Sequence, residues 1–543
     1  MEPTPAVPER RRALAALVDR IVAEVEPLHL AHNEAVWKAN LTGDPAHEAE
    51  GARLDAEIRK IFSRTEPYRE LSDGLKAGGV ADEALQRQLV LLHHSFRANQ
   101  IPAETIERMV KIEKTLESRF NNFRAELDGA QVTDNQLLDV LRHENDSARR
   151  RRAWEAAKQV GREVVGDLLE LVRIRNGAAR DLGFGNYYSM MLELDELDER
   201  ELFAQLEELE RGTRPLFEEY KRELDERLAR RFGIAREALR PWHYSDPFFQ
   251  EAPAAEVDLD QVFAGKSLEQ ITRSFYHAIG FQIDDLLRRA DLYERPGKCQ
   301  HAFCLSVDNR QDIRVLCNLR PTERWMSTML HEFGHAVYDA SVDPSLPFVL
   351  RAPAHTLTTE ASAMLFGRLS KNAAWLTLYA GMPAGEAERA AAAVARAIRG
   401  QLLVQTRWCL VMCHMERALY RDPAQDLDRV WWDLVERFQG LARPEGRSGP
   451  DWASKIHFSV APVYYHNYML GEMMASQLQR HILREVLADG GEAWPRYVTS
   501  PEVGRFLQSR LYRSGRLKDW RETLRAATGE ALGASALVED LAT

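Results

Sequence analysis

The stretch "MLHEFGHAVYDA", residues 329–340, contains His331, Glu332 and His335 in the pattern H-E-x-x-H. The preceding Pro-Thr-Glu at 321–323 is typical of a helix start, and on that helix the two histidines lie one turn apart on one face. Two imidazoles at this spacing can bind one zinc ion, while Glu332 on an adjacent face can reach a water on the metal. The same pattern also arises by chance, so the stretch predicts a metal site only together with a third ligand.

The third ligand is sought in "HTLTTEASAMLFGRL", residues 355–369. A catalytic zinc needs three protein ligands and one open position. Glu360 stands early in a predicted helix and is followed by apolar residues typical of a buried segment. A carboxylate there needs a partner or a metal. Glu360 and His355 are therefore the two candidates for the third ligand.

The segment "CQHAFCLSVDNRQDIRVLCNL", residues 299–319, interrupts an otherwise helical pattern. It holds two short β-type runs around an Asp-Asn-Arg turn, which predicts a hairpin. An isolated hairpin needs a packing partner. Because the H-E-x-x-H helix follows directly, we expect the hairpin to form one wall of the site that this helix lines.

A second group of polar and aromatic residues lies far downstream, in "WASKIHFSVAPVYYHNYMLGEMM", residues 452–474. It includes Lys455, His457, Tyr465 and Tyr468. Taken alone, it reads as an aromatic patch with a hydrogen-bonded histidine. In a zinc hydrolase, however, Tyr and His are suitable donors to the oxyanion that develops on the attacked carbonyl.

The rest of the chain predicts a mainly α protein. Apolar residues recur three and four apart in the stretches 11–25, 201–233 and 387–420. Breaks rich in Pro, Gly and Asp, such as 240–258, divide the chain into an N-terminal helical half (1–240) and a catalytic half (241–543). We interpret both halves as parts of one continuous domain.

Composition excludes several classes of function. The net charge of −11 argues against binding to nucleic acid or anionic membranes. The N-terminus resembles neither a secretory signal nor a membrane anchor. Five sparse cysteines fit a reduced cytoplasm better than a disulfide framework, so a cytoplasmic location is expected. The sequence is compatible with a monomer or a homodimer.

Four segments in order along the chain resemble the angiotensin-converting enzyme family of zinc peptidyl-dipeptidases and, more distantly, the thimet oligopeptidase and oligoendopeptidase group. They are "VWKANLTGD" (36–44), "HAFCLSVDNRQDIRV" (301–315), "HEFGHAVYD" (331–339) with Glu360, and "KIHFSVAPVYYHNY" (455–468). The resemblance implies an almost wholly helical fold, with two lobes around a deep central cleft, N-terminal helices as a lid, and a small hairpin beside the zinc.

The resemblance also implies roles for individual residues. One Zn²⁺ per chain would be held by three ligands, with Glu332 as the catalytic base and two donors to the tetrahedral intermediate. Substrate would be bound by side chains and by the hairpin edge as an added strand. The residues are, for the metal, His331, His335 and Glu360; for the intermediate, His457 and Tyr468; for the substrate, His301, Ala302, Lys455 and Tyr465.

One departure concerns substrate recognition. The family has a Trp-Ala-Gln segment whose glutamine binds the C-terminal carboxylate of the substrate, and the loosely aligned Trp242-His243-Tyr244 contains no glutamine.

The predicted function is hydrolysis of short peptides with release of C-terminal dipeptides. Among enzymes, the alternatives are an oligoendopeptidase and a carboxypeptidase that removes single residues. The non-enzyme alternative is a peptide-binding scaffold.

Overall fold

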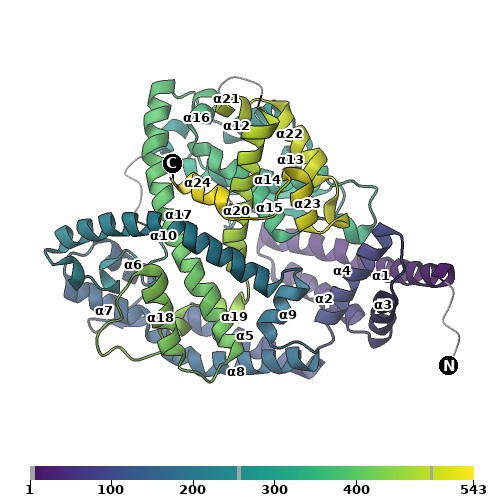
Figure 1. The fold of residues 1–543 in the computed structure, drawn as a ribbon, viewed down its shortest axis with the longest axis horizontal. Helices are drawn as coiled ribbons and strands as arrows, with labels where there is room; N and C mark the ends of the chain where they lie inside the picture. The colour runs from purple at the N-terminus through teal and green to yellow at the C-terminus, as the bar shows by residue number, and fades with distance from the viewer. Residues whose placement is uncertain (1–6, 253–257, 489–492, 543) are drawn as a thin grey trace. The chain divides into compact units, whose positions relative to one another are not determined.

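The computed structural model describes residues 7–252, 258–488 and 493–542. The fold is mainly helical and, within these ranges, contains two sheets of two antiparallel strands each. The three stretches with helical periodicity lie in α1 (Val7–Thr42), α10 (Glu199–Phe232) and α17 (Ala384–Arg421) (Figure 1). The predicted mainly α class is therefore confirmed.

The chain forms two compact units, each built from segments that are distant in sequence. The first unit comprises Met1–Gln100, Glu256–Val394 and Leu470–Ala536. The second comprises Ile101–Ala255, Ala395–Met469 and Leu537–Thr543. The division of one peptidase domain near residue 240 stays a prediction, and each unit is described by itself below.

The first unit carries the H-E-x-x-H helix, α14, and the hairpin that precedes it. Its elements are α1, α2 (Pro45–Phe62), α3 (Thr65–Ala77), α4 (Glu83–Ala98), α11 (Asp260–Phe263), α12 (Leu268–Ala278), α13 (Asp284–Arg289), β3 (Phe303–Ser306), β4 (Ile313–Leu316), α14 (Glu323–Ser341), α15 (Thr356–Gly367), α16 (Ala373–Tyr379), α21 (Ala493–Tyr497), α22 (Pro501–Leu507) and α23 (Trp520–Thr528).

The second unit carries the segment with Lys455 and His457. Its elements are α5 (Ala103–Asn122), β1 (Ala125–Leu127), β2 (Ala130–Val132), α6 (Asp134–His143), α7 (Ser147–Ala157), α8 (Gln159–Asp181), α9 (Tyr187–Leu194), α10, α18 (Leu427–Gln439) and α19 (His457–Val460). Three helices contain residues of both the first and the second unit: α17, α20 (His466–His481) and α24 (Ser535–Ala542).

The N-terminal helices α1 to α4 pack around their own apolar cluster, which includes Leu14, Ile21, Leu71, Leu89 and Phe96. None of the helices in the described ranges is long and apolar enough to cross a membrane. All five cysteines fall within those ranges and are free thiols. The cytoplasmic location stays a prediction.

Candidate functional site

Helix α14 begins where the sequence predicts it. Thr322 is the N-cap, and its side chain accepts a hydrogen bond from the backbone of Trp325 at 3.3 Å. The residues that recur every three or four positions are buried, among them Met326, Leu330 and Phe333. Burying this stripe fixes the rotation of the helix, so that His331 and His335 share a less buried face.

A glycine inside the motif lets α15 approach α14 closely, and the two helices lie side by side (Figure 1). A Cβ atom at Gly334 would stand 2.7 Å from the Cα of Ala363, well inside van der Waals contact. Ser362 donates a hydrogen bond to the carbonyl of Gly334 at 3.0 Å. This close packing brings Glu360, in the first turns of α15, to the two histidines.

His331, His335 and Glu360 form a cluster whose ligand atoms all lie within 4.8 Å of one another. The Glu360 carboxylate oxygens lie 3.7 Å from His331 Nε2 and 4.0 Å from His335 Nε2. Two ligand atoms on one tetrahedral zinc ion are about 3.4 Å apart, so these separations are close to what the ion needs. No other cluster of this kind occurs in the described part of the chain.

The protonation of the cluster also suits a cation. Burial lowers the pKa of His331 to about 4 and that of His335 to about 3, so both imidazoles are neutral near pH 7. Burial raises the pKa of Glu360, and no lysine or arginine of the described residues pairs with it. Two neutral imidazoles and one carboxylate without a protein cation are a donor set that fits Zn²⁺.

The two candidates for the third ligand, Glu360 and His355, differ in their position relative to the two histidines. Glu360 is in the cluster, whereas His355 is the N-cap of α15, where its Nδ1 accepts from the backbone of Leu357 at 3.0 Å. Thr359 was not singled out from the sequence. Its Oγ1 lies 2.7 Å from His335 Nδ1 and therefore orients that ring with Nε2 toward Glu360.

Glu332 is buried beside the cluster and is no member of it. Burial, followed by the nearby charge of Glu360, raises the pKa of Glu332 to about 8. A cation at the cluster favours the ionised form of both carboxylates, because opposite charges lower a carboxyl pKa. The Glu332 carboxyl group therefore lies next to the three candidate metal ligands.

The predicted hairpin is confirmed: β3 and β4 pair antiparallel, with Phe303 opposite Leu316 and Ser306 opposite Ile313. Asp308 in the turn accepts hydrogen bonds from three following backbone N–H groups. Both strands pack against α14. The expectation that the hairpin lies beside the H-E-x-x-H helix is therefore met.

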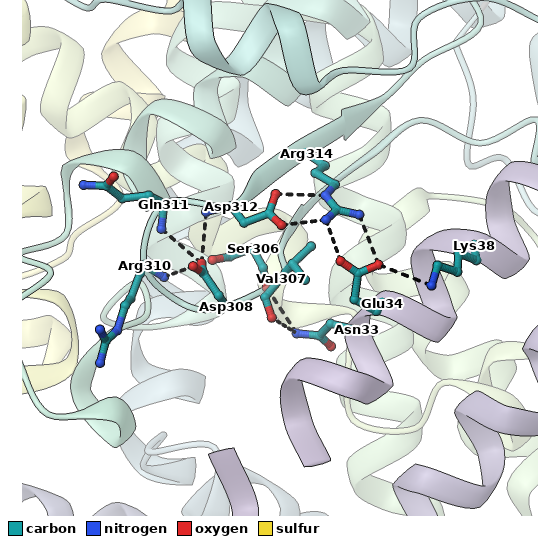
Figure 2. A network of polar contacts seen from close by, with 10 residues as sticks. All are labelled: Asn33, Glu34, Lys38, Ser306, Val307, Asp308, Arg310, Gln311, Asp312 and Arg314. Carbon is teal, nitrogen blue, oxygen red and sulfur yellow. Dashed lines mark hydrogen bonds and ion pairs between the residues drawn. The ribbon is translucent and has the colours of Figure 1, made fainter. Parts of the chain in front are cut away.

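Helix α1 holds one end of the hairpin, as Figure 2 shows. Asn33 donates from Nδ2 to the carbonyls of Ser306 and Val307 at 3.1 and 3.2 Å. Arg314 on β4 pairs with Glu34 of α1 and with Asp312 (Figure 2). Just before β3, Ala302 is partly buried and His301 is exposed.

In the second unit, the Lys455 ammonium donates to the side-chain oxygen of Gln250 at 2.7 Å. Burial lowers the pKa of Lys455 to about 8, and no carboxylate of the described residues pairs with it. Trp408 lies under the ammonium at 5.2 Å and donates from Nε1 to the Tyr465 hydroxyl at 3.2 Å. The side chains of Lys455, Gln250 and Tyr465 thus provide polar groups that suit the binding of a carboxylate.

Gln250, which accepts the hydrogen bond from Lys455, was not singled out from the sequence. Its loop is fixed by Asp246, which accepts from the backbone N–H groups of Phe248, Gln250 and Glu251. Gln439 donates to the carbonyls of Phe248 and Phe249. The pattern aromatic-x-Gln at 248–250 was the available signal.

The segment that carries His457 is held by two buried side chains, Arg175 and Glu416. Arg175 donates to the carbonyls of Phe458 and Ser459. Glu416 accepts from the backbone of Val463 at 2.8 Å, and Val463 has a φ of +57°, which a β-branched residue rarely adopts. We infer that Arg175 and Glu416 are positioning residues for the turn between His457 and Tyr465.

His457 is neutral and available for a further hydrogen bond. Burial lowers its pKa to about 4, and its buried Nδ1 has no hydrogen-bond partner among the described residues. Its ring lies 5.0 Å from the Tyr465 ring. Tyr468 follows one turn into α20, and its ring lies 5.5 Å from that of Tyr465. The structure thus brings the predicted residues of the 455–468 segment together within the second unit.

A helical fold with an H-E-x-x-H helix, a carboxylate from the next helix and a hairpin alongside defines the class of zinc metallopeptidases. The profile of peptidase family M3 matches residues 140–543, and that of angiotensin-converting enzyme matches residues 9–240. Since the first match covers most of the chain, the protein belongs to peptidase family M3, with additional similarity to the angiotensin-converting enzyme type.

A curated relative agrees with these matches. Angiotensin-converting enzyme of Rattus norvegicus is 24% identical over 458 residues, a match that covers 75% of this chain. The match covers 33% of the rat protein, so the chain spans about a third of the length of this relative.

We predict that Gly334→Ala destabilises the first unit by about 1–3 kcal/mol, the usual cost of an extra methyl group in a tightly packed interior. The new Cβ would clash with the backbone of α15 at Ala363, which cannot rotate away. Denaturant unfolding measures the loss. Gly177, on a helix with open space at its Cβ position, is the matched control, and Gly177→Ala should not destabilise the protein. Equal stability of both variants would contradict close packing at Gly334.

Proposed function

We propose that the protein is a zinc-dependent peptidase that hydrolyses short peptides and releases dipeptides from the C-terminus. The observation that carries this proposal is the cluster of His331, His335 and Glu360 with Glu332 beside it. The cluster supplies three ligands and a neighbouring base, the set that metal-assisted hydrolysis requires. Membership of peptidase family M3 supports the same chemistry.

The chain's own residues would divide the reaction between them. A bound zinc ion supplies a Lewis acid that lowers the pKa of water and polarises the peptide carbonyl. Glu332 accepts the proton of the attacking water and later delivers it to the leaving amine as the C–N bond breaks. The products are a free carboxylate and a protonated amine.

We assign His457 and Tyr468 as donors to the carbonyl oxygen that becomes negative during the attack. The free Nδ1 of His457 supports this role. For Tyr468, support comes from α20 itself: a Cβ atom placed on Gly471, three residues later, would stand 3.6 Å from the Cβ of Glu360. His301 would bind a substrate carbonyl.

We further assign the start of β3 as the edge that pairs with the peptide backbone. Val307 donates to Asp312 at 2.8 Å, so in this register Cys304 directs its N–H and C=O away from β4. The outer edge of β4 is occupied, because Asp291 bonds to Val315 and Cys317. Ala302 and Cys304 therefore offer the open edge of the hairpin.

Lys455, Gln250 and Tyr465 would bind the free carboxylate of the substrate's C-terminus. A buried ammonium without a carboxylate partner is costly, and a substrate carboxylate meets that need. Anchoring one end of the peptide gives products of fixed length, which is the basis for proposing dipeptide release.

Removing the ammonium should therefore raise KM for peptides with a free C-terminus. For Lys455→Met we expect an increase of about 10- to 100-fold, the range for losing a charged hydrogen bond of about 1.5–3 kcal/mol. Peptides with an amidated C-terminus should show little change. The measurement is steady-state kinetics on paired free-acid and amidated peptides.

Lys158 provides a matched control. It is also a buried lysine of the second unit, and its ammonium stacks on Phe248, the ring that Lys455 also contacts. Lys158→Met removes the same charge without removing the donor to Gln250. It should leave the ratio of KM values for free-acid and amidated peptides unchanged. A Lys455→Met protein with the wild-type ratio would rule out this carboxylate site.

The product pattern tests the proposed function as a whole. A ladder of peptides with free and amidated C-termini is incubated with zinc-loaded protein, and the products are identified by mass spectrometry. Release of dipeptides from free-acid peptides supports the proposal. Internal cleavage of both forms would establish an oligoendopeptidase. Loss of single C-terminal residues would establish a carboxypeptidase, and binding without cleavage would establish a peptide-binding scaffold.

A further inference from the structure

Asp339 lies on the metal-binding face of α14 but has no place in the hydrolysis described above. It follows His335 by four residues, so the two side chains are neighbours one turn apart on the same side of the helix. Its Oδ2 lies 4.0 Å from the sulfur of Cys304, on β3. Asp339 is therefore one helical turn from His335 and lies next to the strand with the open edge.

The Asp339 carboxylate is mostly buried, and no cation of the described residues pairs with it. Burial raises its pKa to about 7, because water is excluded and no positive charge compensates. A carboxylate that is ionised in such a place needs a compensating positive charge, which the described residues do not supply.

The alternation of β3 shows which part of a bound peptide would meet this carboxylate. Phe303 directs its side chain toward α1, where its ring lies 5.9 Å from that of Trp37. Cys304, the next residue, directs its sulfur to the opposite face, toward Asp339 on α14. A residue on an antiparallel strand directly opposite Cys304 has its side chain on this same face, with Cα atoms about 5.5 Å apart.

We propose that Asp339 is a specificity-determining residue that selects peptides with a positive charge at the position opposite Cys304. The charge would come from a lysine or arginine side chain, or from a free α-ammonium group when that residue is the first of the peptide. An ammonium or guanidinium at this place forms a charge-assisted hydrogen bond with the Asp339 carboxylate. This inference deepens the proposed peptidase function and rests on it.

The test is a lysine scan. Peptides of one sequence carry lysine or its uncharged analogue norleucine at each position around the cleaved bond, with a free or an acetylated N-terminus. For wild-type protein we expect kcat/KM to be at least about 10-fold higher with lysine than with norleucine at one position, as one charged hydrogen bond provides. If acetylation alone abolishes a preference, the cation is the α-ammonium group.

Two variants assign the preference to this residue. Asp339→Asn should bring the lysine-to-norleucine ratio close to 1. Asp343→Asn is the matched control, because Asp343 lies just beyond the end of α14 and pairs with Arg513. It should keep the wild-type ratio. A preference for lysine that survives in Asp339→Asn, or equal turnover of all peptides by wild-type protein, would overturn the proposal.

A binding experiment separates recognition from chemistry. Glu332→Gln protein, with and without Asp339→Asn, is titrated with the lysine and norleucine peptides by calorimetry. Tighter binding of the lysine peptide that depends on Asp339 supports the proposal even if cleavage fails. Equal affinities for both peptides would overturn the proposed role of Asp339. The peptidase function is tested separately by the peptide-ladder experiment.

Discussion

Glu332→Gln protein should bind zinc and peptide normally and lose most of its turnover. We expect kcat to fall by about 10²- to 10⁴-fold, the usual contribution of a general base. Glu332 lies outside the ligand cluster, so the amide leaves the three ligands in place. It cannot accept the proton of the attacking water, because a neutral amide is no base at any working pH.

Glu323→Gln is the control for this variant. Glu323 is on the same helix, but it lies in the first turn and pairs with Lys371 and Ser370. The control should retain wild-type kcat, and elemental analysis should find equal zinc in all three proteins. Turnover near the wild-type value in Glu332→Gln would remove this residue from the mechanism.

Glu360→Ala should lose the metal itself. Removing a residue that orients a ligand costs 10- to 100-fold in metal affinity, and removing one of three ligands costs at least about 100-fold. The change also leaves two neutral imidazoles, whose pKa values are low in the folded protein, without the only carboxylate of the cluster. Competition with a chromophoric chelator measures the dissociation constant.

Two neighbours of Glu360 make this prediction specific. His355→Asn removes the other candidate ligand and keeps a side chain able to cap α15, so zinc affinity should be unchanged. Thr359→Val removes the hydroxyl that orients His335 and should weaken zinc binding by about 10- to 100-fold. Full zinc and full activity in Glu360→Ala would refute the ligand assignment.

The parts of the site that could be predicted are those encoded locally. The helix start at Thr322, the one-turn spacing of His331 and His335, and the hairpin around Asp308 all depend on residues close together in sequence. Glu360 was a candidate because an acid entering an apolar helix needs a partner, and the family resemblance favoured it over His355.

The parts that could not be predicted depend on contacts between distant segments. Gln250 meets Lys455, and Arg175 reaches the carbonyls after His457, across gaps of 200 or more residues. Nothing near Arg175 in the sequence marks it as a member of that group. The compact units, each assembled from separated segments, likewise follow from long-range packing rather than from a local signal.

The central claim is that peptide hydrolysis depends on one zinc ion held by His331, His335 and Glu360. The most direct measurement is cleavage of a free-acid peptide by protein stripped of metal, followed during titration with Zn²⁺. The account predicts no cleavage before zinc is added and full activity at one equivalent per chain, with no recovery in Glu360→Ala under the same conditions. Cleavage that persists in the metal-free protein, or recovery of wild-type activity by the Glu360→Ala protein at one equivalent, would contradict it.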